Sequence, residues 1–212
     1  MSGKIARKNF ERYGIERSPF SLRPTKRDLA ALLGESVKDL KTLAIPSFKE
    51  QFVVRRQAET GTKKKKIRDL VYPVSRLRGI HERLKFHLNK VRQPSYLFSP
   101  RKDRSQRDNA AMHLDQEMYL TLDLKQFYPS TTSAMVRRWF QNELGMFPDI
   151  ARLLTDLSTI DEKVSFGSPL TPVLCTLVHR EMFNEIADVC EVHELRYTLW
   201  VDAVSYTHLT LP

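Results

Sequence analysis

Apolar residues near the N-terminus recur with the three- and four-residue spacing of helices. The capping-box pattern Thr25-x-x-Asp28 predicts a helix start, and Gly34 predicts its end. A second helix is predicted from Ser36-x-x-Asp39 to Pro46. The apolar faces of the two helices are made of leucines: Leu29, Leu32, Leu33, Leu40 and Leu43. Residues 1–24 are basic, include two prolines, and are expected to form an irregular arm.

A basic β-hairpin is predicted next. One strand is expected over 52–56, a turn over 60–62 and a second strand over 67–73, with four lysines at 63–66. That lysine run is either a hairpin tip or a solvated loop. The following segment, 75–91, has helical spacing of its apolar residues, namely Leu77, Ile80, Leu84, Leu88 and Val91. Its opposite face is either solvated or lies along a phosphate backbone, and carries Arg76, Arg78, Arg83, Lys85 and Lys90.

The C-terminal half alternates between strand and helix patterns. A loop with a short helix is expected over 95–113, a strand over 118–124 and a helix over 132–144. Pro148 suits the first turn of the next helix, and 167–172 is expected to be a turn. A long helix from Val173 to about Glu194 and a final apolar strand over 196–201 complete the pattern. The fold class predicted is α+β.

Charge favours a polyanionic partner. The 212 residues carry a formal net charge of +10, and the pI is about 9.7. Such an excess is typical of nucleic-acid-binding proteins, although a merely basic protein remains an alternative. No apolar run is long enough for a membrane span and no secretory signal is visible, so we expect a cytoplasmic protein with no membrane contact. Cys175 and Cys190 fall in one predicted helix and fit reduced thiols.

Two aspartates end apolar strands. Asp123 follows the strand residues 119–122, and Asp202 follows 197–201. A carboxylate in such a place is either paired with a metal or caps the next turn. If the strands are neighbours, both carboxylates meet at one sheet edge, where they could bind Mg²⁺ together with substrate phosphates.

Three motifs in order carry a family resemblance. The segment Leu122-Asp-Leu-Lys-Gln-Phe-Tyr-Pro-Ser130 resembles motif A of bacterial reverse transcriptases. Phe166-Gly-Ser-Pro-Leu-Thr-Pro172 resembles their motif B loop, and Tyr197-Thr-Leu-Trp-Val-Asp202 resembles the start of motif C. Weaker matches lie upstream: Leu29–Gly34, Lys66-x-Arg68, and Ser105-x-x-x-Asn109-Ala-x-x-His113. The resemblance covers about residues 25–202 and is closest to retron and group II intron-like enzymes.

The resemblance implies a right-hand polymerase with fingers and palm. It places N-terminal helices and fingers at 25–113 and a partial palm at 114–202, with an antiparallel palm sheet backed by helices and no thumb. The activity implied is RNA-directed DNA synthesis, in which a primer 3′-OH attacks a dNTP. The implied partners are an RNA template, a DNA or RNA primer, dNTPs and a cognate non-coding RNA.

Residue roles follow from the same resemblance. Asp123 and Asp202 would be catalytic and, with Leu124, would hold two Mg²⁺ ions. The dNTP would be contacted by Lys66, Arg68, Gln126, Phe127 and Tyr128. Tyr128 would be the steric gate under the sugar, although a core role is an alternative. Template and primer would be contacted by Gly167, Ser168, Pro169, Asn109 and His113. For Asn109 and His113, a hydrogen-bonded loop is an equally good interpretation.

Ala203 departs from the family pattern, because a second aspartate belongs there. The residues 203–212 have no family counterpart, and one back-translation of them resembles a transposon-end sequencing adapter. We therefore expect 203–212 to be a fusion scar, the chain itself to be inactive, and the last hairpin to lack its returning strand. Smaller departures are Phe166 before the motif B glycine, Thr176 near an expected asparagine, and Trp200 in motif C.

Two other functions remain open from the sequence. One is a nucleic-acid-binding protein that has kept the polymerase fold and lost the chemistry, which Ala203 favours. The other is a polymerase of a phage-defence system, which would carry the same motifs. A metal-dependent polymerisation assay distinguishes the first alternative from a reverse transcriptase. Sequencing of the product distinguishes the second alternative from it.

Overall fold

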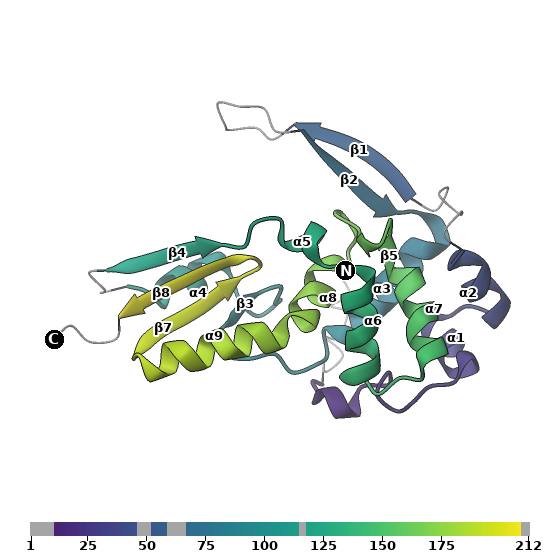
Figure 1. The fold of residues 1–212 in the computed structure, drawn as a ribbon, viewed down its shortest axis with the longest axis horizontal. Coiled ribbons are helices and arrows are strands. Elements are labelled where there is room, and N and C mark those ends of the chain that lie inside the picture. Colours follow the sequence, from purple (N-terminus) through teal and green to yellow (C-terminus); the bar gives the residue numbers. More distant parts are fainter. Residues whose placement is uncertain (1–10, 46–51, 59–66, 115–117, 209–212) are drawn as a thin grey trace, which may run out of the picture.

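A helical body, a small sheet beside it and a projecting hairpin make up the chain (Figure 1). The computed structural model describes residues 11–45, 52–58, 67–114 and 118–208, with the backbone alone for 52–58, 67–69 and 208. Several predicted features lie outside the described residues: part of the N-terminal arm, Pro46, the turn at 60–62, and the lysines at 63–66.

The N-terminal helices begin where their capping residues predict. After a short 3₁₀ turn (Ile15–Arg17), α1 spans Lys26–Leu33 and α2 spans Val37–Leu43. The side chains of Thr25 and Asp28 form the complete capping box, and Ser36 caps α2. Leu29, Leu33, Leu40 and Leu43 are buried, as predicted.

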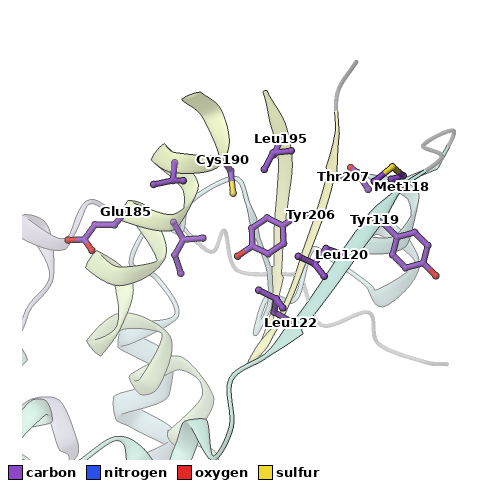
Figure 2. A pocket seen from close by; sticks show the side chains of 11 residues that line it. Met118, Tyr119, Leu120, Leu122, Glu185, Cys190, Leu195, Tyr206 and Thr207 are labelled. Atoms are coloured by element: carbon purple, nitrogen blue, oxygen red, sulfur yellow. The ribbon is translucent and has the colours of Figure 1, made fainter. Parts of the chain in front are cut away.

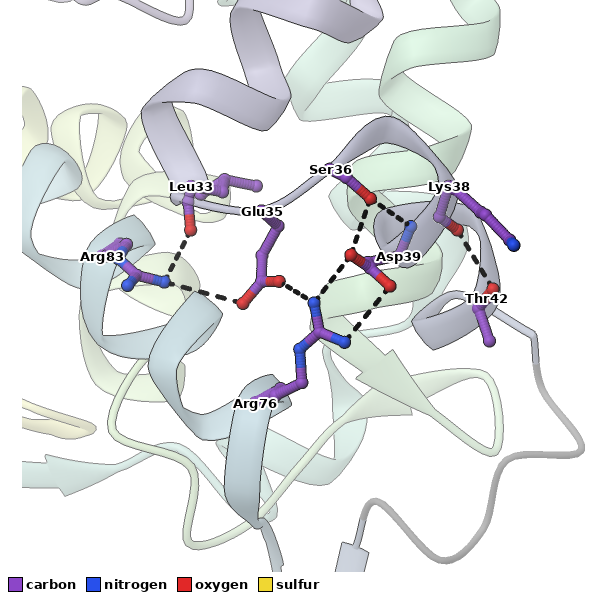
Figure 3. A network of polar contacts seen from close by, with 8 residues as sticks. All are labelled: Leu33, Glu35, Ser36, Lys38, Asp39, Thr42, Arg76 and Arg83. Carbon is purple, nitrogen blue, oxygen red and sulfur yellow. Dashed lines mark hydrogen bonds and ion pairs between the residues drawn. The ribbon is translucent and has the colours of Figure 1, made fainter.

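A network of ion pairs ties the link between α1 and α2 to helix α3, Ser75–Leu88 (Figure 3). Arg76 pairs with Glu35 and, at 2.8 Å, with Asp39, and it holds the pKa of Asp39 down at about 2. Arg83 donates to the Leu33 carbonyl at 2.6 Å and so caps the end of α1. Two of the arginines on the predicted basic face of α3 therefore have partners within the protein.

The predicted hairpin and its following helix are confirmed. Strands β1 (Phe52–Ala58) and β2 (Ile67–Pro73) pair antiparallel in continuous register, and Figure 1 shows them projecting from the helical body. The apolar face of α3 is buried over its whole length, from Leu77 to Leu88, with Val91 just beyond.

Six more helices build the body and its extension toward the sheet. They are α4 (Gln106–Ala111), α5 (Phe127–Ser130), α6 (Ser133–Asn142), α7 (Pro148–Ser158), α8 (Thr171–Val178) and α9 (Arg180–Val192). A small antiparallel ladder, β5 (Thr159–Ile160) with β6 (Lys163–Val164), follows α7. The prediction of one long helix from Val173 is wrong, because the chain breaks at His179 between α8 and α9. Both cysteines are free and buried, one in each helix.

The four-stranded sheet is mixed. Its strands β3 (Leu97–Ser99), β4 (Tyr119–Asp123), β7 (Leu195–Trp200) and β8 (Ala203–His208) lie in the order β3-β7-β8-β4. The prediction of an antiparallel sheet is wrong in one place, since β3 pairs with β7 in parallel. About a hundred residues separate these two strands, which is ample for the crossover that a parallel pair needs.

Strand β8 corrects a second prediction. We expected the last hairpin to lack its returning strand, but residues 203–208 occupy that position and pair with β7 on one side and β4 on the other. Val204 and Thr207 of this strand are almost fully buried, and the strand is hydrogen-bonded to a neighbour on each edge. The origin of residues 203–212 stays a prediction.

An apolar groove of about 840 Å³ lies between α9 and the sheet (Figure 2). Figure 2 shows Leu122, Leu195 and Tyr206 along the sheet side of this groove, opposite α9. On the α9 side the groove is lined by Ile186, Val189 and Cys190. None of the described helices is long and apolar enough to cross a membrane.

Candidate active site

The backbone brings the two aspartates to the same end of the sheet. Asp123 ends β4 opposite Ala203, and Asp202 lies in the turn between β7 and β8. The Leu124 amide donates to the Asp202 carbonyl at 2.9 Å, which fixes the two segments against each other. The sequence prediction assumed that β4 and β7 are direct neighbours. They are not, because β8 lies between them. Figure 1 shows this sheet end next to α5.

Backbone strain is found on both sides of this sheet end. Val201 has φ of +61° and Gln126 has φ of +56°, in the left-handed region that residues with a side chain seldom adopt. For a β-branched residue such as Val201 this is a costly conformation, of order 1–3 kcal/mol. Such strain is retained where the surrounding structure enforces it, and it is frequent at functional sites.

The donor set suits a hard cation that also uses substrate oxygens. Asp123 is exposed and Asp202 half-buried, so both carboxylate positions are reachable from solvent. Among the described residues there is no cluster of three or more His, Cys, Asp or Glu side chains that would make a closed metal cage. Magnesium needs no such cage, since it is commonly held by one or two carboxylates, water and phosphate oxygens. The residues therefore fit Mg²⁺ at this edge.

Helix α5 places Tyr128 beside the aspartates. The Tyr128 ring is half-buried, and its centroid lies 5.8 Å from that of Phe166. Burial raises the pKa of Tyr128 far above its usual value, and the adjacent Cys175 and Asp202 raise it further. Tyr128 thus lies near both Asp202 and the 165–170 turn.

Phe127 lies next to Tyr128, with ring centroids 5.5 Å apart, but in the core. It is 5% exposed and packs against His179 and Phe183. His179, at the break between α8 and α9, also hydrogen-bonds the Thr131 hydroxyl at 2.9 Å and so anchors the end of α5. The burial of Phe127 argues against the predicted dNTP contact by its side chain, whereas Gln126 is exposed.

The turn at 165–170 exposes a glycine between buried neighbours. Gly167 is exposed with φ of +116°, while Ser165 and Ser168 are almost fully buried. A β-carbon on Gly167 would lie 3.3 Å from the Val71 carbonyl oxygen of β2. Glycine is therefore required by both conformation and contact. Of the three predicted nucleic-acid contacts here, Gly167 and Pro169 remain accessible, and the Ser168 side chain does not.

The other predicted contacts fall elsewhere or outside the described residues. His113 hydrogen-bonds two sheet hydroxyls, Thr207 at 2.9 Å and Thr198 at 2.7 Å, which supports the structural alternative for it. The Asn109 amide oxygen is buried without a hydrogen-bond partner. Lys66 and the side chain of Arg68 lie outside the described residues.

Sequence reasoning missed His81. Its ring is fully buried and contacts Ser168 Oγ at 2.6 Å and the Leu157 carbonyl oxygen at 2.7 Å. The signal was present in the sequence, because His81 lies on the apolar face of its helix between Leu77 and Leu84. A histidine in such a position must find buried hydrogen-bond partners.

Comparison with known proteins gives two informative relatives. The chain is 31% identical over 153 residues to the Retron Se72 reverse transcriptase of Salmonella heidelberg (strain 579083-10), covering 71% of this chain and 39% of the relative. It is 29% identical over 206 residues to the Retron Mx65 reverse transcriptase of Myxococcus xanthus, covering 86% of this chain and 47% of the relative. The chain thus spans less than half the length of either relative. No protein-family model matches it.

Proposed function

Since the chain is a relative of the bacterial retron reverse transcriptases, we propose that it forms the fingers and palm of an RNA-directed DNA polymerase. The observation that carries this proposal is the meeting of Asp123 and Asp202 at one sheet end, beside Tyr128 and the exposed Gly167. In the proposal, the sheet and α9 belong to the palm, and the β1–β2 hairpin belongs to the fingers.

The proposed reaction is attack by a primer 3′-OH on the α-phosphate of a dNTP, directed by an RNA template. Two bound Mg²⁺ ions would supply activation of that hydroxyl and charge neutralisation at the leaving pyrophosphate. Asp123, Asp202 and the Leu124 carbonyl would hold the ions. Gly167 would let the backbone approach the new base pair, because it has no side chain to block it.

We further propose that the chain is part of a longer polymerase, called here the longer protein, in which an aspartate replaces Ala203. Support comes from the relatives, which are more than twice as long as their aligned segments. The 212-residue chain itself is expected to be inactive, because it has alanine at 203. Sequencing the source locus across codon 203 provides the longer protein for the assays below.

Primer extension tests the proposal directly. The longer protein, given an RNA template, a DNA primer, dNTPs and Mg²⁺, is expected to make DNA whose sequence is complementary to the template. Omission of Mg²⁺ should abolish the product. Tight template binding with no extension under any of these conditions would favour the second candidate, a non-catalytic nucleic-acid-binding protein, for which Ala203 is the specific observation.

Tyr128 gives a prediction about sugar choice. Replacing Tyr128 by alanine in the longer protein should let ribonucleotides enter more readily, because the ring would no longer occupy the space beside a 2′-OH. Tyr128→Phe keeps the ring and should keep the preference for dNTPs. The measurement is the ratio of kcat/KM for a dNTP to that for the matching rNTP. An unchanged ratio in Tyr128→Ala would make Tyr128 a core residue only.

The lysine run gives a prediction about binding. Changing Lys63, Lys64, Lys65 and Lys66 to glutamine should weaken binding to single-stranded nucleic acid and flatten its salt dependence, by up to about 0.7 in log–log slope for each lost phosphate contact. Changing Lys38 and Lys41 on α2 to glutamine is the charge-matched comparison for a variant in which Lys63 and Lys64 alone are changed. Titrations at several salt concentrations give the slope, and a slope equal to that of the unmodified chain would make the run a bystander loop.

A further inference from the structure

One buried histidine joins three separate parts of the molecule. His81, on α3, is fully buried, and its two ring nitrogens contact the end of α7 and the 165–170 turn. The contacts join residues 76 and 87 positions apart in sequence, so local geometry does not create them. Within the candidate site, His81 connects the turn to both α3 and the end of α7.

The direction of each hydrogen bond follows from the partners. The Leu157 carbonyl can only accept, so Nε2 of His81 carries the proton and Nδ1 accepts. The Ser168 hydroxyl then donates to Nδ1, and its oxygen accepts the Leu170 amide at 3.1 Å. Burial lowers the pKa of His81 to about 4, so the ring is neutral near pH 7. Both ring nitrogens of His81 and the Ser168 hydroxyl therefore have hydrogen-bond partners, and the direction of each bond is fixed.

Strand β2 holds the same turn from the other side. The Val71 amide donates to the Phe166 carbonyl at 2.8 Å, and the Ser165 hydroxyl donates to the Val71 carbonyl. Ser165 and Ser168 are therefore fixed on two different elements, and Gly167 is the exposed residue between them. The position of Gly167 depends on both attachments.

We propose that His81 is a positioning residue, which through Ser168 sets where the 165–170 turn presents its backbone to the nucleic acid. The proposal rests on the function proposed above, in which this turn contacts the new base pair. Small displacements of groups that align substrates are costly to the reaction, which is why a buried bond behind the turn matters. His81 itself touches no substrate.

Three variants separate positioning from general packing. His81→Leu removes both ring bonds and keeps an apolar side chain of comparable bulk. His81→Gln has an amide oxygen and nitrogen that can replace the acceptor and donor. Ser168→Ala removes the partner in the turn. His87→Leu is the matched control, since His87 lies on the same helix and its ring packs against Phe20 and Phe86, away from the turn.

The structural test uses the 212-residue chain and no activity. Amide hydrogen exchange is measured by NMR at Val71 and Leu170, with Leu199 in the sheet as the reference amide. His81→Leu should speed exchange at Val71 and Leu170 and leave Leu199 protected, and His81→Gln should restore protection. Unchanged turn amides in His81→Leu, or equal acceleration at Leu199, would overturn the proposal.

The functional test uses the longer protein and compares KM for the dNTP with kcat. His81→Leu and Ser168→Ala should each raise KM by about tenfold, within the range expected for misplaced substrate contacts. The double variant should be no worse than either single one, because both remove the same bond, and His81→Gln should recover most of the loss. A normal KM in His81→Leu, or additive losses, would overturn the proposal. If the unmodified longer protein makes no DNA, the proposed function fails, while hydrogen exchange still decides whether His81 sets the turn.

Discussion

Replacing Asp123 by alanine in the longer protein is expected to reduce Mg²⁺-dependent DNA synthesis to background, a loss of more than about a thousandfold. The physical reason is that a metal ligand stabilises charge that develops in the transition state, which contributes several kcal/mol to the rate. Asp123 is exposed at the end of β4, so its loss leaves the core packing unchanged.

Nucleic-acid affinity measured without Mg²⁺ should survive this substitution, because a carboxylate repels phosphate and its removal does not weaken the direct attraction between the basic side chains and the nucleic acid. Primer-extension rates and binding titrations on the same preparation separate the two effects. Asp188→Ala is the matched control, since Asp188 is an exposed aspartate on α9 outside the site. Full synthesis by Asp123→Ala would remove the metal assignment.

Replacing Gly167 by alanine is expected to destabilise the 212-residue chain by about 1–3 kcal/mol, the usual cost of forcing a side chain into such a backbone conformation. The φ of +116° is unfavourable for alanine, and its β-carbon would also press on the Val71 carbonyl at 3.3 Å. Any relief of that contact moves the turn away from β2. In the longer protein, synthesis should therefore fall together with stability.

Two other glycines provide internal controls for this prediction. Gly145 shares a positive φ, +60°, but has nothing within 4 Å of an added β-carbon, so its alanine variant reports strain alone. Gly79 lies inside α3, and its β-carbon would make an ordinary 3.6 Å contact, so alanine there should stabilise the helix by about 0.5–1 kcal/mol. Urea unfolding of the three variants gives the ranking. A Gly167→Ala chain as stable as Gly145→Ala would show that the Val71 contact is unimportant.

Local patterns predicted the parts of the chain whose structure is decided locally. The capping box at Thr25 and Asp28 marks the start of α1 because the side chains satisfy amides three residues away. The leucine stripe of α3 is buried because its spacing places every member on one face. Strands β4 and β7 were found in the same way, by apolar runs that end in aspartate.

Features that depend on distant partners were not accessible to the same reasoning. The parallel pairing of β3 with β7 depends on which strand is nearest in space, and a three-residue strand has no detectable period. The break at His179 was hidden because apolar residues continue with helical spacing through both α8 and α9. Gln126 and Phe127 both match motif A of the family, so the motif alone could not show that Gln126 is exposed and Phe127 is buried.

The strand order has a consequence for how the chain folds as it is synthesised. Strand β4 pairs with β8 and with no other described strand, and eighty residues must be added after Asp123 before Ala203, its partner, exists. Contacts that close such long loops form late, after the local helices. Much of the helical body can therefore assemble around α3, α6 and α7 before β4 has a strand to pair with. The two carboxylates come together only when β8 pairs with β4, so the candidate site is expected to form late in folding.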